Sequence, residues 1–466
     1  MQYVSTRGGA DPLRFSDATL AGLAPDGGLF VPDAYPALTP QALKALRGRP
    51  YEDVALAVMA RFADSDIAEA DLKADIDGAM ATFAHAARTP LVQIGPRDFL
   101  LELFHGPTLA FKDVAMQTIA RLMDRILAER GRRATIVTAT SGDTGAAAAQ
   151  AFRGKSAIDV FILYPDGRVS DVQRRQMTTI DDANVHTLAV AGDFDDCQRI
   201  VKDLFVDRDF NERVAMSGVN SINWARVAAQ IGYYVFAALA LGAPGRRVAF
   251  SVPTGNFGDI LAGYVATRMG LPIERLVIAT NQNDILDRLA RSGSYEPGRV
   301  APSTSPSMDI QVSSNFERLV FDLSGRDAAS VSQRLADVPR RGFALSAAER
   351  EEMGQLFSSA RADDNDTAAT IAALYRETGM IIDTHTAVGL KAARETDLPD
   401  DVARITLATA HPAKFPDAVE AACGVRPPVP ARLAAVLGDT ERMTKVPADT
   451  RAVAATILER TRAAAA

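Results

Sequence analysis

The sequence predicts an α/β protein with two doubly wound, mostly parallel sheets. From about residue 91 onward, short apolar runs alternate with segments of helical periodicity. Residues 134–140 (ATIVTAT), 158–165 (IDVFILYP), 246–253 (RRVAFSVP) and 404–411 (RITLATAH) have the length of strands, and helical segments follow them. Strands that are joined by helices in this way pair in parallel, with helices on both faces of the sheet.

The beginning of the chain has a different pattern. Residues 39–48 and 51–64 have the spacing of amphipathic helices. Residues 292–313 are rich in Ser and Pro and predict a long irregular connection. We therefore expect three domains: a mainly helical N-terminal domain over residues 1–95, a smaller α/β domain over 96–240 and a larger α/β domain over 241–466.

Composition limits the classes of partner. The chain of 466 residues has 58 acidic and 51 basic residues, which give a formal charge of −7 without blocks of one sign. A nucleic-acid-binding protein needs a basic face or stripe, so we expect no nucleic-acid partner. Small anionic ligands are not excluded, because backbone amides at helix N-termini bind anions even in a protein without net positive charge.

The sequence also predicts a reducing location away from membranes. No apolar run approaches the roughly 18 residues of a membrane span, and the first residues lack the pattern of a signal peptide. The only cysteines, Cys197 and Cys423, are far apart in sequence. We expect both to be buried and reduced, and we expect no metal site, since they lack metal-ligand spacing. The cytoplasm is the expected location.

Two glycine-containing loops follow predicted strands. Residues 140–145 (TSGDTG) offer the hydroxyls of Ser141 and Thr144 around Asp143. Residues 253–260 (PTGNFGDI) place Gly255 and Gly258 on either side of Asn256 and Phe257. Such loops at helix N-termini bind phosphate groups or carboxylates in many α/β proteins. An ordinary strand-to-helix turn with a helix cap explains either loop equally well in isolation.

A third loop, residues 408–415 (ATAHPAKF), ends the last predicted strand. Thr409 is expected near the carboxyl end of that strand. His411 is a candidate for catalysis, but a single histidine before a proline is more typical of a structural turn.

Lys112 stands in the segment 102–113 (ELFHGPTLAFKD), at the start of a predicted helix. A cation there faces the positive end of the helix dipole, and the neighbouring Leu109 and Phe111 reduce its hydration. Both effects favour the neutral amine, which attacks carbonyl groups to form Schiff bases. The alternative is a lysine whose ammonium extends into solvent. A Schiff-base lysine together with a phosphate-binding loop is typical of pyridoxal phosphate enzymes.

Six segments in the same order resemble the threonine synthase family, a group of pyridoxal phosphate enzymes with the tryptophan-synthase-like fold, called fold type II. The six segments are ELFHGPTLAFKD, TSGDTG, NSINWAR, VPTGNFGDI, DTHTAVG and ATAHPAKF. Residues 3–8 (YVSTRG) and 24–32 (APDGGLFVP) resemble the N-terminal region of the same family, so the resemblance covers nearly the whole chain.

The resemblance implies a role for each matching residue. Lys112 matches the lysine that binds pyridoxal 5'-phosphate covalently. Gly255, Asn256, Phe257 and Gly258 match the loop that binds the cofactor phosphate. Thr409 matches the residue beside the pyridine nitrogen of the cofactor. The implied substrate-binding residues are Ser141, Asp143 and Thr144, in the loop that faces the substrate carboxylate, and Ser221, Asn223 and Arg226, which contact the substrate phosphate or the ring hydroxyl.

The implied reaction converts O-phospho-L-homoserine and water to L-threonine and phosphate, the last step of threonine biosynthesis. The implied partner is that small substrate, and the chain is expected to be a monomer or a homodimer. Two alternatives remain: a related serine or threonine dehydratase or cysteine synthase, and a non-catalytic protein that binds a phosphorylated metabolite, with Lys112 on the surface.

Overall fold

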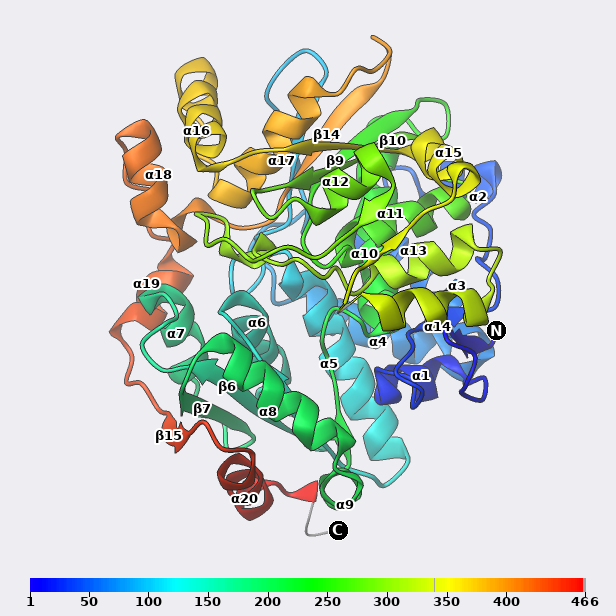
Figure 1. The fold of residues 1–466 in the computed structure, drawn as a ribbon. Coiled ribbons are helices and arrows are strands. Elements are labelled where there is room, and N and C mark those ends of the chain that lie inside the picture. The colour runs from blue at the N-terminus through cyan, green and yellow to red at the C-terminus, as the bar shows by residue number, and fades with distance from the viewer. Residues whose placement is uncertain (339, 464–466) are drawn as a thin grey trace.

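A computed structural model describes residues 1–338 and 340–463. The chain forms two sheets, each covered by helices, with a group of N-terminal helices beside them (Figure 1). In this view the larger sheet lies at the top, the smaller sheet lies at the bottom, and the N-terminal helices lie on the right. The expected α/β architecture of two mostly parallel sheets with an N-terminal helical region is confirmed.

The N-terminal region is mainly helical, as expected. Its two strands form an antiparallel pair, and Thr39 caps the helix that begins at Pro40 by accepting a hydrogen bond from the amide of Ala42. The elements are β1 (Tyr3–Ser5), α1 (Phe15–Ala21), β2 (Phe30–Pro32), α2 (Pro40–Leu46), α3 (Tyr51–Ala63), η1 (Asp64–Asp66) and α4 (Glu69–Met80).

The large sheet has six strands in the order β13-β10-β9-β14-β4-β3, and only the β3–β4 pair is antiparallel. The strands are β3 (Leu91–Gln93), β4 (Asp98–Glu102), β9 (Val248–Pro253), β10 (Ile273–Thr280), β13 (Phe357–Arg361) and β14 (Ala403–Ala408). The expected boundary at residue 96 needs correction here. Strand β4 pairs with β14, some 300 residues later, and so belongs to the large sheet.

The small sheet has five parallel strands in the order β15-β7-β6-β5-β8. They are β5 (Ala134–Ala139), β6 (Ile158–Pro165), β7 (Val185–Ala191), β8 (Met216–Ser217) and β15 (Thr444–Pro447). Strand β6 is buried at every residue, as expected for a strand with helices on both faces. The expected range 241–466 also needs correction, because β15 returns to the small sheet and pairs with β7.

Helices connect and cover both sheets. In the first half of the chain they are α5 (Lys112–Glu129), α6 (Asp143–Phe152), α7 (Asp171–Thr178), α8 (Phe194–Val206), α9 (Arg208–Val214) and α10 (Trp224–Ala240). In the second half they are α11 (Gly258–Arg268), α12 (Ile285–Ser292), α13 (Phe316–Leu323), α14 (Ala328–Asp337), α15 (Ala347–Leu356), α16 (Asp364–Thr378), α17 (Thr384–Glu395), α18 (Pro416–Cys423), α19 (Ala431–Gly438) and α20 (Thr450–Arg460).

The predicted irregular connection over residues 292–313 is confirmed. It contains only the two-residue strand β11 (Ser294–Tyr295), which pairs with β12 (Phe343–Ala344), and the short helix η2 (Pro306–Met308). A further short helix, η3 (Pro412–Lys414), follows β14.

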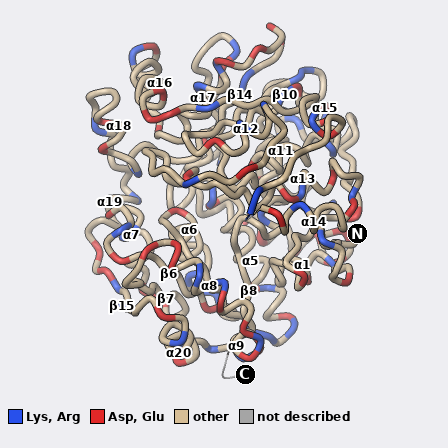
Figure 2. Tube along the Cα trace, in the orientation of Figure 1, with Lys and Arg blue, Asp and Glu red and all other residues tan. Residues whose placement is uncertain are grey.

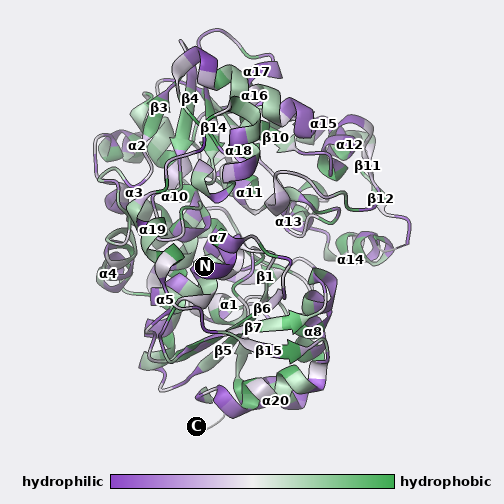
Figure 3. Cartoon of the chain, turned by 90° about the vertical axis from the view of Figure 1, so that its left-hand side faces the viewer, coloured by the Kyte–Doolittle hydropathy of each residue, from purple (hydrophilic) through white to green (hydrophobic). Residues whose placement is uncertain are grey.

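The main core joins the N-terminal helices to both sheets. Helix α10 is buried along most of its length and packs against α3, α5 and α11. A separate core cluster lies on the other face of the small sheet, where Val453 and Ile457 of α20 meet Cys197 of α8. Figure 3 shows hydrophobic residues concentrated in the strands of both sheets.

Charged residues of both signs are interspersed along the chain in the view of Figure 2. Within residues 1–338 and 340–463, no helix is long and apolar enough to cross a membrane. Both cysteines are free thiols in the structure. The expectation that both are buried holds for Cys197 but not for Cys423, which is only half-buried because it lies at the end of the surface helix α18.

Candidate active site

The predicted site loops all lie at carboxyl ends of parallel strands. Lys112 follows β4, the glycine loop 254–258 follows β9, and Thr409 follows β14, all in the large sheet. The TSGDTG loop follows β5 in the small sheet. Ligands of open α/β sheets bind at such edges, so the sheet topology is consistent with one site shared by these loops.

Backbone hydrogen bonds hold the segment before Lys112 against the end of β14. Ala110 and Ala410 form an isolated antiparallel bridge. The amide of Phe111 donates to the carbonyl of Thr409 at 2.8 Å, and the amide of His411 donates to the carbonyl of Leu109 at 3.0 Å. The start of α5 is therefore fixed to the large sheet, and the helix begins at Lys112.

The turn before Lys112 is shaped by the next residue, Asp113. Its carboxylate is buried and accepts hydrogen bonds from the amide (2.7 Å) and the hydroxyl (2.8 Å) of Thr108. A side chain at Gly106 would collide with this carboxylate, so glycine is required at that position. Leu109 adopts a φ of 61°, which is unusual for a residue with a side chain. This turn directs the chain into α5 with Lys112 as the first helical residue.

Lys112 lies in a mostly buried position beside Asp143. Its Nζ atom is 3.6 Å from Oδ2 of Asp143, and 12% of its side chain is exposed. Burial lowers the pKa of Lys112, and the positive charges of Lys414 and Arg226 act in the same direction, against the opposite effect of Asp143. The structure therefore favours a buried amine at Lys112 over the surface ammonium that the sequence left open.

The carboxylate of Asp143 lies beside two lysines, Lys112 and Lys414. Its Oδ1 atom is 3.0 Å from Nζ of Lys414 and accepts a hydrogen bond of 2.9 Å from the side-chain Nε2 atom of Gln173. Burial would raise the pKa of Asp143, but Lys414 and Lys112 outweigh it and hold the pKa well below its usual range. An ionised carboxylate repels a substrate carboxylate, so the geometry supports a role for Asp143 in holding lysines.

In the rest of the TSGDTG loop, a threonine side chain holds the backbone, and two further residues carry hydroxyl groups. The hydroxyl of Thr140 accepts hydrogen bonds from the amides of Gly142 and Gly145, both at 2.9 Å. Ser141 is exposed and Thr144 is half-buried. These two hydroxyls are the members of the predicted trio that stay available to a substrate.

The glycine loop after β9 presents an open helix N-terminus. Helix α11 begins at Gly258, and no side chain of the described residues caps it. Phe257 before it has a φ of 63° and a buried ring that packs against Phe316 and Phe357. A Cβ atom on Gly255 would lie 3.0 Å from the carbonyl oxygen of Ser307. The first-turn amides of α11 are thus suited to bind an anion.

Asn315 joins this loop to the NSINWAR segment. Its amide donates to the carbonyl of Asn256 at 3.1 Å, and its side chain donates to the carbonyl of Ser221 at 3.1 Å. No sequence pattern indicated Asn315, since it lies in none of the recognised segments. It holds the starts of α11 and α10 close together.

Arg226, in the first turn of α10, is buried with unused hydrogen-bonding capacity. It donates to the carbonyl of Val219 at 3.1 Å, but its Nε atom has no partner among the residues that the structure describes. Burial lowers the pKa of Arg226 to about 10. A buried guanidinium without a carboxylate partner is a suitable anion contact.

Asn223 has a structural position that differs from its expected one. Its side-chain oxygen caps α10 at the amide of Ala225, and its side-chain nitrogen donates to the carbonyls of Thr19 and Gly218. The side chain is fully buried. Because these bonds occupy its amide group, the structure gives Asn223 the role of a helix cap, and we correct its expected role as a substrate contact.

The two candidate side chains after β14 differ in their surroundings. Thr409 is buried, and its carbonyl orients the start of α5 through the bond to Phe111. The His411 ring accepts a hydrogen bond of 3.1 Å from the amide of Ala413 and packs edge-on against Phe104. Burial lowers the pKa of His411. This arrangement supports the structural interpretation of His411.

Besides Asn315, the sequence analysis missed three further residues around the site. Lys414 contacts Asp143, Ser307 places its hydroxyl 3.5 Å from Oδ2 of Asp143, and His385 accepts a hydrogen bond from the amide of Ser307. Lys414 and His385 lie in segments already noted, ATAHPAKF and DTHTAVG. A charged residue within an otherwise apolar segment was the signal that could have identified Lys414.

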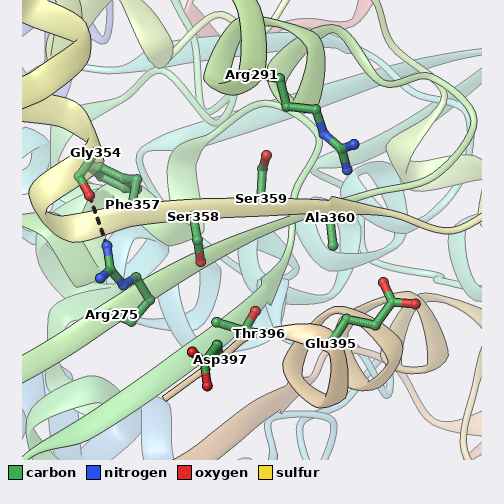
Figure 4. Close-up of a pocket in the computed structure, with 10 residues that line it drawn as sticks. All are labelled: Arg275, Arg291, Gly354, Phe357, Ser358, Ser359, Ala360, Glu395, Thr396 and Asp397. Atoms are coloured by element: carbon green, nitrogen blue, oxygen red, sulfur yellow. Dashed lines mark hydrogen bonds between the residues drawn. The ribbon is translucent and has the colours of Figure 1, made fainter. Parts of the chain in front are cut away.

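A separate surface pocket of about 560 Å³ lies at the edge strand β13 (Figure 4). Arg275 lines it and donates to the carbonyl of Gly354 at 2.8 Å, and Ser358 and Ser359 project to opposite sides of the strand. None of the predicted site residues lines this pocket. Among the described residues, no cluster of His, Cys, Asp and Glu side chains is suited to a metal ion.

Comparison with known proteins identifies the family. Three family models match: "Threonine synthase N terminus" over residues 2–80, "Pyridoxal-phosphate dependent enzyme" over residues 83–407 and "Threonine synthase, C-terminal" over residues 386–457. A threonine synthase from Pseudomonas aeruginosa is 51% identical over 96% of both chains. The chain belongs to the threonine synthase family.

Solved structures of threonine synthases agree with this assignment. The pyridoxal-phosphate-bound threonine synthase from Brucella melitensis is 54% identical, with a TM-score of 0.97 over 99% of this chain and 100% of that chain. The threonine synthase from Escherichia coli is 32% identical, with a TM-score of 0.84 over 98% of this chain and 100% of that chain. The fold is therefore that of the threonine synthase family over nearly its full length.

Pyridoxal phosphate is the cofactor of this family, and the site's residues fit it. Lys112 offers a mostly buried amine, and the open N-terminus of α11 offers amides for the phosphate. An aldehyde and a phosphate on one small molecule match this set of donors.

Proposed function

We propose that this protein forms L-threonine and phosphate from O-phospho-L-homoserine and water, with pyridoxal phosphate bound through Lys112. The observation that carries the proposal is the placement of Lys112. It is a mostly buried amine, with a lowered pKa, in a family in which pyridoxal phosphate is the cofactor.

Lys112 has the properties of a group that moves protons. A lowered pKa makes the neutral amine more available to take a proton from a substrate carbon and to return it. The cofactor, when bound, supplies a conjugated ring into which electrons from the substrate's carbon atoms are delocalised. Asp143 lies close enough to Lys112 Nζ to fix its position between proton transfers.

We assign the anion contacts from the same arrangement. Gly255, Asn256, Phe257 and Gly258 would hold the cofactor phosphate through the N-terminus of α11, and Thr409 would supply a hydroxyl to the pyridine nitrogen. Arg226 and the backbone around Ser221 bind the substrate phosphate, since the unpaired Nε atom of Arg226 requires an anion or another acceptor.

The hydroxyls of Ser141 and Thr144 are the proposed contacts for the substrate carboxylate. Helix α6 begins beside them, and its positive dipole end favours a bound carboxylate. Asp143 is omitted from this group because both of its oxygens face lysines.

We propose that the protein works in the cytoplasm, as a monomer or a homodimer. Free thiols at Cys197 and Cys423 suit a reducing compartment.

The activity is tested by incubating the full-length protein with pyridoxal phosphate and O-phospho-L-homoserine, and by measuring threonine and phosphate together. We expect equal amounts of both products from the wild type and none from Lys112→Ala. Parallel reactions with L-serine and L-threonine measure keto-acid formation, which a dehydratase would give. Faster turnover of either of these amino acids than of the phosphorylated substrate would overturn the proposal, and so would the absence of turnover of all three.

A further inference from the structure

A second lysine, Lys414, contacts the same carboxylate as Lys112 and is completely buried. It lies in η3, directly after β14, and none of its side chain is exposed. Its Nζ atom is 2.7 Å from the carbonyl oxygen of Thr108, 2.8 Å from Oε1 of Gln176 and 3.0 Å from Oδ1 of Asp143. An ammonium group has three N–H donors, so every donor of Lys414 has an acceptor.

Lys112 is held much more loosely. Its Nζ atom has one ionic neighbour, Oδ2 of Asp143 at 3.6 Å, and part of its side chain is exposed. The two lysines therefore contact different oxygens of the Asp143 carboxylate. Lys414 lies close to Oδ1, and Lys112 lies farther from Oδ2. One of them has all its donors satisfied, and the other keeps its nitrogen available.

The contacts of Lys414 also join separate parts of the fold. Thr108 belongs to the turn before α5, Gln176 belongs to α7, and Asp143 belongs to α6. The carbonyl of Thr108 accepts a second hydrogen bond from the side-chain Nε2 atom of Gln176 at 3.0 Å. Lys414 thus connects the end of the large sheet to two helices of the small sheet, at the place where Lys112 emerges.

We propose that Lys414 is a positioning residue that occupies one oxygen of Asp143 and so leaves Lys112 as the reactive amine of the pair. The inference rests on the proposed function in one respect, namely that Lys112 is the residue that reacts. It adds an explanation of why Lys112 reacts and Lys414 does not, although both lysines lie beside the same carboxylate.

The physical reason is competition for one negative charge. With Lys414 in place, its positive charge opposes the attraction of Asp143 for a proton on Lys112. Without Lys414, Asp143 has Lys112 as its one remaining cationic neighbour among the ion pairs of the described residues, and the proton on Lys112 becomes more favourable. The other charges around Lys112 are Arg226 on α10 and the adjacent Asp113 on α5. Lys414 lowers the pKa of Asp113, so loss of Lys414 also raises the pKa of that carboxyl.

The test compares lysine reactivity in the full-length chain after the cofactor has been removed. Brief labelling with acetic anhydride across pH 6 to 10, followed by peptide mass spectrometry, gives the pH midpoint of each lysine, with exposed Lys44 as internal reference. We expect Lys112 to react at lower pH than Lys44, and Lys414 to stay unlabelled while the protein is folded. In Lys414→Met the Lys112 midpoint should rise by about one pH unit, a tenfold loss of reactivity at neutral pH.

Three further variants separate this effect from loss of structure. Lys414→Arg keeps the charge and should leave the Lys112 midpoint near the wild-type value. Gln176→Met removes one contact of Lys414 but leaves Asp143 paired, and it should also leave the midpoint unchanged. Asp143→Asn removes the shared carboxylate, which favours the protonated form of Lys112, and the Lys112 midpoint should fall below the wild-type value.

The cofactor-loaded enzyme offers a second measurement. Loss of a nearby positive charge favours the protonated form of the Lys112 nitrogen there as well. The pH midpoint of the visible absorbance should therefore move upward in Lys414→Met. An unchanged Lys112 midpoint in folded Lys414→Met, or labelling of Lys414 as fast as Lys112, would overturn the inference. The labelling uses neither substrate nor cofactor, so its outcome is independent of whether threonine is formed.

Discussion

The hydroxyl of Ser307 lies 3.5 Å from Oδ2 of Asp143, so a loop beside the large sheet meets a helix of the small sheet next to Lys112. The backbone of Ser307 is held by His385, whose Nε2 atom accepts its amide hydrogen bond at 3.2 Å. The other ring nitrogen of His385 donates to Oδ2 of Asp383 at 2.8 Å. The irregular connection over residues 292–313 is thus anchored where it passes the site.

His385→Ala should loosen this connection. It removes one buried and one partly buried hydrogen bond and leaves the carboxylate of Asp383 and the amide of Ser307 each without one partner, which costs about 1–3 kcal/mol. Urea unfolding, followed by the fluorescence of the single tryptophan, Trp224, measures this loss. The exposed His85 provides the matched control, since His85→Ala should cost less than about 1 kcal/mol. Equal stability of the two variants would contradict the anchoring role of His385.

Gly255→Val should weaken cofactor binding. The added side chain would press against the carbonyl of Ser307 and the side chain of Ile310, and overpacking of this kind costs about 1–3 kcal/mol. We expect the dissociation constant of pyridoxal phosphate, measured by absorbance titration, to rise about tenfold or more. Gly354→Ala is the matched control, because nothing lies within 4 Å of a Cβ atom at that position. Unchanged affinity in Gly255→Val would place the phosphate cradle elsewhere.

Arg226→Ala should affect the substrate more than the cofactor. Loss of a charge-assisted hydrogen bond of about 1.5–3 kcal/mol corresponds to an increase in KM of about 10- to 100-fold. Steady-state kinetics and cofactor titration on the same preparation separate the two effects. Arg132→Ala, at an exposed position, should change neither quantity. A change confined to cofactor affinity would move Arg226 from the substrate phosphate to the cofactor.

Asp259, at the start of α11, should make stability depend on pH. Burial raises the pKa of Asp259 from 3.8 to about 6, although the hydroxyls of Tyr233 and Tyr234 donate to its Oδ1 atom and act in the opposite direction. The folded state therefore holds this proton more tightly than the unfolded state, and stability is lost as pH rises from about 4 to about 6.

Asp259→Asn removes this titration. The difference in free energy of unfolding between Asp259→Asn and the wild type should widen in favour of the variant by roughly 3 kcal/mol between pH 4 and pH 7. The buried Asp113 also has its pKa raised to about 6, but it is present in both proteins and cancels. A difference that does not change with pH would show that Asp259 is ionised in the folded protein throughout this range.

The local parts of the site were predictable from sequence, and its long-range contacts were not. A strand followed by a glycine loop and a helix is a local pattern, so the loops after β5 and β9 and the helical start at Lys112 were predicted. The partners of these loops depend on tertiary packing. Lys414 and the carbonyl of Thr108 are 306 residues apart in sequence, and no periodicity relates them.

The same reason explains the domain boundaries. Strand β15 has the composition of its neighbours in sequence, but it pairs with β7, more than 250 residues earlier. Asn223 illustrates a further limit, because a polar residue beside a helix start is equally suited to bind a ligand or to cap the helix. Only the positions of Thr19 and Gly218 decide between the two roles.

The attachment of the cofactor to Lys112 is tested most directly by reducing the cofactor-loaded protein with sodium borohydride and mapping the modified peptide by mass spectrometry. We expect the mass of the cofactor on the peptide that contains Lys112 and none on the peptide that contains Lys414. Lys112→Ala should give no modified peptide and no visible absorbance band. Modification of Lys414, or an unmodified Lys112 in protein that retains the visible band, would contradict the account.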